Sequence, residues 1–200
     1  MNNLLYQQKS LKTLEGKFLI ASPHLDDAYF GRSIIYICAH DESGAIGIII
    51  NQQIGNVAPE DLLKNYTPPQ VPKLNIGNKK IPVLFGGPIN TEIVVALSIT
   101  KQQELSFTRH QKVNLHVDMS RFLKEFVAGK TKPSKFILVR GVSAWDSAQL
   151  EGEIAENSWF IVNPSIDLLF SQRIKHKWDY IMKELGILDF NYLVHYSGSA

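Results

Sequence analysis

The sequence predicts an α+β protein, built as a single domain with a large mixed β-sheet flanked by helices. Short runs rich in β-branched residues recur along the chain and cluster in hairpins, while helical segments intervene irregularly instead of alternating with the strands. The length of 200 residues fits one generous domain, and a 44% hydrophobic fraction supplies a core without disulfide staples. No change in composition marks a boundary inside the chain.

The N-terminal part predicts a short arm followed by the first strand. Residues 1–9 are polar and mixed, so we expect a loose arm before a domain that spans residues 10–200. Residues 17–22 form an apolar run that Pro23 ends, as expected of a strand.

Two further runs, 32–39 and 46–50, predict a hairpin. Residues 41–45 join them, and this segment has a favoured hairpin length and contains a glycine. Alternate residues of the first run are apolar on both faces, which is typical of a central strand covered on both sides. Such a strand requires helices or a second sheet as covering layers.

Three segments are predicted to be helices. Residues 59–63 begin with a proline, which suits a first helical turn, and Ser120 is expected to cap a helix that Gly129 closes. The clearest apolar stripe runs through 174–185, with Gly186 as its stop. The remaining strands are expected at 81–85, 93–99, 113–117, 136–140 and 159–162.

Composition excludes several functional classes. The net charge of +2 does not support direct DNA binding, and basic stretches such as 173–177 are expected to be solvated surface. A single cysteine, Cys38, fits a reducing compartment and is expected to be a buried thiol. The N-terminus has no signal-peptide pattern, and the apolar runs are too short for a membrane span, so we expect a cytoplasmic protein.

The segment after the first strand suggests a zinc site as an alternative function. His24, Asp26 and Asp27 resemble the His-x-Asp-Asp motif of zinc-dependent deacetylases, in which imidazole and carboxylate hold a metal that activates water. However, Ala28 replaces the usual glutamate, and no other histidines have the expected His-x-x-His spacing. The competing interpretation is a turn that one of the two aspartates caps.

Arg32 and Asn51 are candidate ligand-binding residues. They lie at the outer ends of the first hairpin, so antiparallel pairing should bring them close together. An arginine beside an amide can hold a carboxylate or phosphate. The alternative is a structural salt bridge from Arg32 to Asp26 or Asp27.

Two turn regions complete the candidate site. Gly86, Gly87 and Pro88 follow an apolar strand, where exposed N–H groups could hold an anion or simply form a sharp turn. Trp145 lies in an expected strand-turn-helix junction, with Asp146 as the predicted helix N-cap. The capping pattern leaves Trp145 unexplained, so it could line a pocket or cover the edge of the sheet.

Several segments together resemble the AlgH/YqgE family of bacterial proteins. The matching stretches are Gly16–Ala21, Phe30–Tyr36, Gly44–Gly47 through Asn51, Phe85–Pro88, Trp145 with Gln149–Glu151 and Glu153, and Asn157 with Trp159. The resemblance runs from about residue 10 to the C-terminus, and it implies an α+β domain with a large mixed sheet. The chain departs from the family pattern at Ala28, where proline is common, and at Ser199, where histidine is usual.

The resemblance implies a role in transcriptional regulation, although the sequence shows no helix-turn-helix pattern. We therefore expect a cytosolic, non-catalytic binding or regulatory domain with a small-molecule or protein partner. No cofactor or metal is expected in this interpretation, and the oligomeric state is not predicted. A metal-dependent hydrolase or deacetylase that uses His24, Asp26 and Asp27 is the alternative.

Overall fold

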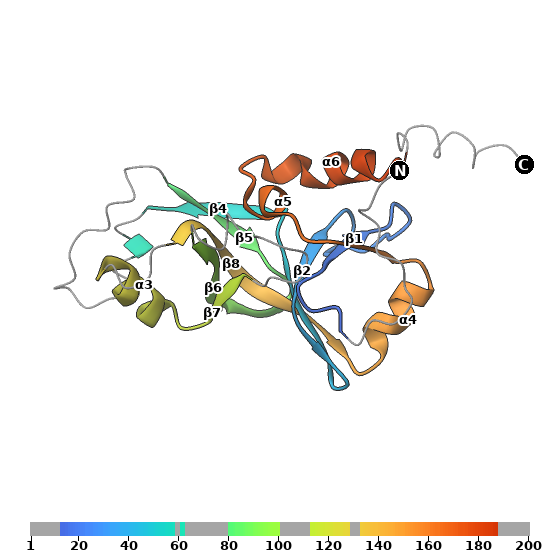
Figure 1. Ribbon diagram of the computed structural model, residues 1–200, viewed down its shortest axis with the longest axis horizontal. Helices are drawn as coiled ribbons and strands as arrows, with labels where there is room; N and C mark the ends of the chain where they lie inside the picture. The colour runs from blue at the N-terminus through green and yellow to red at the C-terminus, as the bar shows by residue number, and fades with distance from the viewer. Residues whose placement is uncertain (1–12, 59–60, 63–79, 101–112, 129–132, 188–200) are drawn as a thin grey trace, which may run out of the picture.

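The computed structural model describes residues 13–58, 61–62, 80–100, 113–128 and 133–187 (Figure 1). The strands are β1 (Phe18–Ala21), β2 (Ile34–Asp41), β3 (Gly44–Ile49), β4 (Gln53–Val57), β5 (Ile81–Phe85), β6 (Ile89–Thr100), β7 (Asn114–His116), β8 (Pro133–Asp146) and β9 (Trp159–Val162). The helices are α3 (Met119–Val127), α4 (Gln149–Ala155), α5 (Ile166–Phe170) and α6 (Lys177–Glu184), the last preceded by the 3₁₀ turn η1 (Ile174–His176).

The described strands form one mixed sheet of nine strands, in the order β4-β5-β8-β3-β2-β1-β9, with β6 pairing with both β8 and β7. The pairing of β5 with β8 is parallel, whereas β1 with β2 and β6 with β8 are antiparallel. This arrangement confirms the α+β class and the mixed sheet. Among the described helices, none is long and apolar enough to cross a membrane.

Strand β8 holds the two parts of the sheet together. Its N-terminal part pairs with β6 and β5, and residues 143–146 then pair with β3. The strand-turn-helix junction predicted over residues 141–151 is present, but its strand is longer than the predicted 136–140, because residues 141–146 also belong to β8. Cross-strand pairing with β3 keeps this segment extended although a glycine interrupts its apolar pattern.

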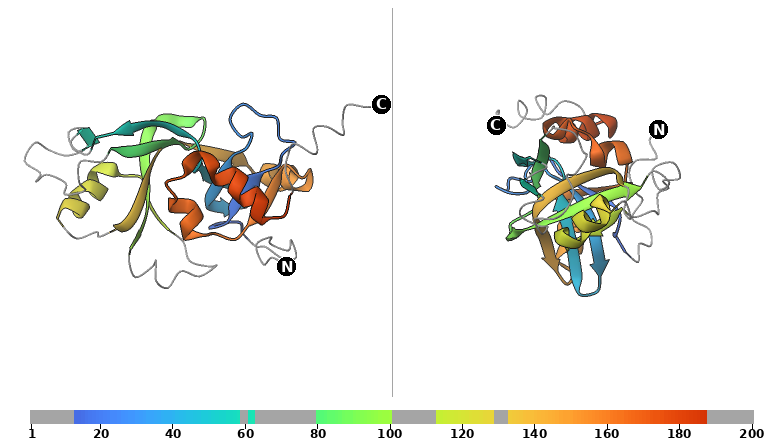
Figure 2. Two further views of the ribbon diagram at one scale, coloured as in Figure 1. Left: turned by 90° about the horizontal axis from the view of Figure 1, so that it is seen from above. Right: turned by 90° about the vertical axis from the view of Figure 1, so that its left-hand side faces the viewer.

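Helices cover both faces of the central strands, as the pattern of β2 predicts. Ile34 packs in a core cluster that contains Trp178 of α6. Its neighbour Ile35 points to the other face and packs in a cluster that contains Leu150 of α4. Figure 2 shows α5 and α6 lying together over the sheet, and in Figure 1 α3 and α4 lie at opposite ends of the long axis.

The hairpin between β2 and β3 is tighter than predicted. The strands extend to Asp41 and Gly44, so two residues form the connection instead of residues 41–45. The Asp41 carboxylate accepts a hydrogen bond from the Ser43 N–H at 2.8 Å. Gly44 has a φ of 137°, and a Cβ there would lie 2.1 Å from the Trp145 carbonyl oxygen, so glycine is required.

Helix ends differ in part from the predictions. Asp118, not Ser120, caps α3, because its side chain accepts a hydrogen bond from the Arg121 N–H. The helix predicted at 174–185 begins with a 3₁₀ turn, and Gly186, at a φ of 74°, ends it as predicted. Gly129 and the arm at 1–9 lie outside the described residues, as does most of the 59–63 segment, of which 61–62 are helical.

Candidate functional site

Asn51 and Arg32 lie together, as predicted from the hairpin, but they contact each other through the main chain. The Asn51 amide nitrogen donates to the Arg32 carbonyl oxygen at 2.8 Å, and its side-chain oxygen accepts from the Ile34 N–H at 2.8 Å. The buried Asn51 side chain therefore continues the hydrogen bonding between β2 and β3 beyond the last pair of backbone groups. It fixes the backbone of Arg32, which has a φ of 57°.

The Arg32 side chain reaches helix α6. Its guanidinium pairs with Asp179 and lies over the ring of Trp178, 4.3 Å from the ring centroid. The expected alternative of a salt bridge is therefore present, but its partner is Asp179 and not Asp26 or Asp27. Both partners are more than half exposed, so the pair contributes little to folding and chiefly sets local charge.

Gly86 and Gly87 lie where β5 approaches β8 closely. The Gly86 N–H donates to the Arg140 carbonyl at 2.8 Å, so this amide is already used within the sheet. The Gly86 carbonyl accepts from the Ser143 hydroxyl at 3.0 Å. A Cβ on Gly87 would lie 2.3 Å from the Val142 backbone, while Pro88 is exposed. These contacts support the turn interpretation of this segment.

Trp145 lies in β8 and is buried, not on the turn that the sequence predicted. Its indole N–H donates to Glu153 Oε2 at 2.9 Å, and the Trp159 indole donates to the same oxygen at 2.8 Å. Gln149 Nε2 donates to the other carboxylate oxygen at 2.9 Å. The two tryptophans thus anchor α4 to the sheet.

The start of α4 also differs from prediction. Its N-cap is Ala148, in a left-handed conformation with a φ of 60°, and not Asp146. Only one half of the predicted capping pattern is present, because the Gln149 side chain accepts from the Asp146 N–H at 3.0 Å.

We expect Glu153→Ala to lower the free energy of unfolding by about 2–3 kcal/mol, because two buried indole N–H groups lose their acceptor. Urea denaturation measures this loss. Glu156→Ala at the C-terminal end of the same helix is the control, with an expected change of about 0.5 kcal/mol or less since its side chain is exposed. Equal losses in both variants would contradict the anchoring role.

The proposed zinc ligands form a capped turn. Asp27 Oδ1 accepts from the N–H groups of Tyr29 and Phe30 at 2.8 and 2.9 Å. His24 and Asp26 are exposed beside it. Across the described residues, no group of three His, Cys, Asp or Glu side chains is placed to hold a metal ion. The geometry therefore supports the turn and gives the zinc alternative no support.

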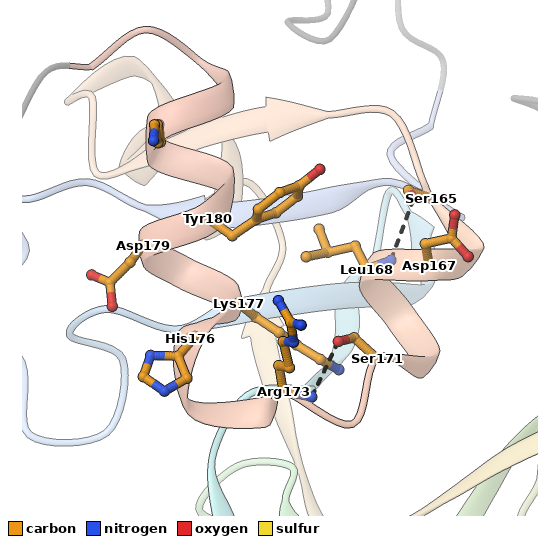
Figure 3. A pocket seen from close by; sticks show the side chains of 10 residues that line it. Ser165, Asp167, Leu168, Ser171, Arg173, His176, Lys177, Asp179 and Tyr180 are labelled. Atoms are coloured by element: carbon orange, nitrogen blue, oxygen red, sulfur yellow. Dashed lines mark hydrogen bonds between the residues drawn. The ribbon is translucent and has the colours of Figure 1, made fainter.

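A pocket of about 610 Å³ lies between α5 and α6 (Figure 3). It exceeds the pockets of about 380 and 270 Å³ beside β4 and α3. Leu168 and Tyr180 line it from the two helices, and the Tyr180 side chain is largely exposed. Its other lining residues are polar or charged: Ser165, Asp167, Ser171, Arg173, His176, Lys177, Asp179 and Lys183.

Lys177 is buried at the inner side of this pocket, although the sequence predicted a solvated basic stretch at 173–177. Its amine donates to the Ile50 carbonyl at 3.0 Å and to the Leu169 carbonyl at 2.8 Å. Burial lowers the pKa of Lys177 to about 7, because the charged form is poorly solvated there. Lys177 thereby ties α6 to α5 and to the end of β3.

The thiol of Cys38, a second potential nucleophile, is partly buried against the core. Burial raises the pKa of the Cys38 thiol to about 12, so it stays protonated at neutral pH. The side chain is less buried than predicted, although it packs against the core as a structural thiol does.

Sequence reasoning missed the pocket between α5 and α6, and none of the predicted site residues lines it. Arg32 comes nearest, through its contact with Asp179. One signal was available for Lys177: it follows Ile174 by three positions and precedes Ile181 by four, so it lies on the buried stripe. The five-residue α5 was too short to predict from periodicity.

Comparisons with known proteins identify similar chains. The pattern of the AlgH-like family matches residues 18–189. A UPF0301 protein from Buchnera aphidicola is 35% identical over 188 residues, covering 92% of this chain and 96% of that protein. A UPF0301 protein from Shewanella sp. (strain W3-18-1) is 34% identical, with 88% and 93% covered.

Two solved structures share the fold. The solution structure of the AlgH protein from Pseudomonas aeruginosa superposes with a TM-score of 0.67 at 26% identity, covering 98% of both chains. The crystal structure of a protein from Corynebacterium diphtheriae has a TM-score of 0.64 at 20% identity, covering 90% of both chains, and this likeness concerns the fold alone.

Proposed function

Because this chain belongs to the AlgH-like family, we propose that it acts as a binding domain that holds a small molecule in the pocket between α5 and α6. The observation that carries the proposal is the pocket itself. Its volume of about 610 Å³ lies in the range of small-molecule sites. Leu168 and Tyr180 offer an apolar contact area, and the polar groups around them can orient a ligand.

The proposal is for binding without catalysis, in a cytoplasmic protein. The regulatory role that the sequence resemblance implies would then be exerted through the bound molecule. A direct DNA contact is less well supported, because the net charge is only +2. Binding of a ligand between α5 and α6 would also act on Lys177, which connects these two helices to β3.

Tyr180→Ala tests the pocket with N-phenyl-1-naphthylamine, a neutral aromatic probe whose fluorescence rises in apolar sites. We expect the dissociation constant to rise about fivefold, because the probe loses packing against the exposed Tyr180 ring. Tyr29→Ala is the matched control: Tyr29 is similarly exposed, stacks on Phe85 and lies outside the pocket. An unchanged affinity in Tyr180→Ala, or an equal loss in both variants, would overturn the proposal.

A further inference from the structure

The positively and negatively charged side chains around the pocket do not balance one another. Arg173 and Lys183 line it, and within the described residues neither side chain forms an ion pair. His176, Tyr180 and Lys183 follow one another along the η1–α6 segment at intervals of four and three positions, and Arg173 directly precedes η1. Cationic and aromatic groups therefore lie side by side along one wall of the pocket.

Two carboxylates, those of Asp167 and Asp179, also line the pocket, but only one of them opposes a bound anion. Arg32, which does not line the pocket, pairs with Asp179 and neutralises it. Asp167 lies on α5, on the opposite wall. Arg173 and Lys183 are therefore set against a single unneutralised carboxylate, which leaves the pocket cationic.

Several contacts hold Arg32 in place beside Asp179. Asn51 fixes its carbonyl group, its backbone takes a left-handed conformation with a φ of 57°, and its guanidinium lies against Trp178. These contacts come from two separate segments of the fold, the residues after β3 and helix α6. Arg32 therefore acts as a positioning residue that offsets the negative charge of Asp179 without lining the pocket.

We infer that the pocket between α5 and α6 selects a ligand that joins an aromatic or apolar body to an anionic group, and that Arg32 maintains this selectivity by neutralising Asp179. The apolar body would pack on Tyr180 and Leu168, and the anionic group would pair with Arg173 or Lys183. This inference rests on the proposed function, because it assigns the chemistry of the same pocket. A carboxylate, sulfonate or phosphate would serve equally as the anion.

A pair of probes separates charge from packing. 8-Anilinonaphthalene-1-sulfonate carries the same aromatic rings as N-phenyl-1-naphthylamine plus one sulfonate, so we expect it to bind the wild-type protein more tightly. Arg173→Gln combined with Lys183→Gln should weaken the sulfonate probe about tenfold and leave the neutral probe unchanged, because charge–charge attraction is removed.

Substitutions of Arg32 and Asp179 give a second test, because they are expected to change the affinity for the sulfonate probe in opposite directions. Arg32→Gln should weaken the sulfonate probe about threefold, because the Asp179 carboxylate is no longer neutralised. Asp179→Asn should tighten its binding by a similar factor. Because partly folded proteins also bind this probe, the near-UV circular dichroism spectrum of the variant should match that of the wild-type protein. The double variant should return to the wild-type affinity or exceed it.

The outcomes distinguish the two proposals. Suppose that Tyr180→Ala weakens binding of the neutral probe, while every charge variant keeps the dissociation constant of the sulfonate probe within twofold of wild type. The proposed anion selectivity is then wrong, and the proposed binding pocket is supported. If Tyr180→Ala affects neither probe, both proposals fail. Opposite shifts in Arg32→Gln and Asp179→Asn support both.

Discussion

The stability of the wild-type protein should rise relative to Lys177→Met by about 4 kcal/mol between pH 7 and pH 10, or about 1.4 kcal/mol per pH unit. Burial lowers the pKa of Lys177 from 10.5 to about 7. Between these values the unfolded chain holds a proton that the folded protein lacks. The contribution of Lys177 to the free energy of unfolding is therefore highest above pH 10.5. It decreases as the pH falls to 7 and changes no further below pH 7.

Urea denaturation of both proteins at several pH values between 7 and 10 measures this difference. Lys175→Met is the control, because Lys175 is exposed on the adjoining turn, and it should follow the wild-type pH dependence. Parallel curves for wild type and Lys177→Met would show that Lys177 stays charged in the fold. The amine would then have access to water, and the packing of α6 against the sheet described above would be wrong.

Gly86→Ala is expected to lower the free energy of unfolding by about 4 kcal/mol, among the larger losses for one substitution. The added Cβ would lie 2.2 Å from the Gly141 carbonyl oxygen and 2.4 Å from Val139 Cγ1. Strands β5 and β8 would have to separate, since a backbone atom cannot move aside as a side-chain end can. Thermal or urea denaturation gives the loss directly.

Gly152→Ala provides the matched control for this substitution. A Cβ at Gly152 meets nothing within 4 Å and lies inside α4, so alanine should raise stability by about 0.5–1 kcal/mol. If Gly86→Ala folds with wild-type stability, the close approach of β5 to β8 is wrong. The anion-binding interpretation of the Gly86-Gly87 turn would then regain support.

The fold was largely predictable because its signals are local. The apolar residues on both faces of β2 indicated covering layers on both sides, and α4 and α6 supply them. The extent of β8 was not predictable, since its last residues are strand only because β3 pairs with them. Likewise, the short α5 depends on packing against the sheet more than on a sequence pattern.

The candidate site was predictable only in part, because its contacts join distant segments. The proximity of Arg32 to Asn51 follows from one hairpin, and the structure shows it. The contact of Arg32 with Asp179 spans 147 positions, which no local pattern reveals. Trp145 and Glu153 are only eight positions apart, yet the turn predicted between them concealed their hydrogen bond.

The central claim, that the pocket between α5 and α6 is the binding site, is tested most directly by NMR. Backbone amide shifts of the 22.6 kDa protein would be followed during titration with 8-anilinonaphthalene-1-sulfonate. We predict saturable changes confined to residues 165–183 and the neighbouring Arg32. Changes centred on the pocket beside β4 or the one beside α3, with residues 165–183 unaffected, would contradict the account.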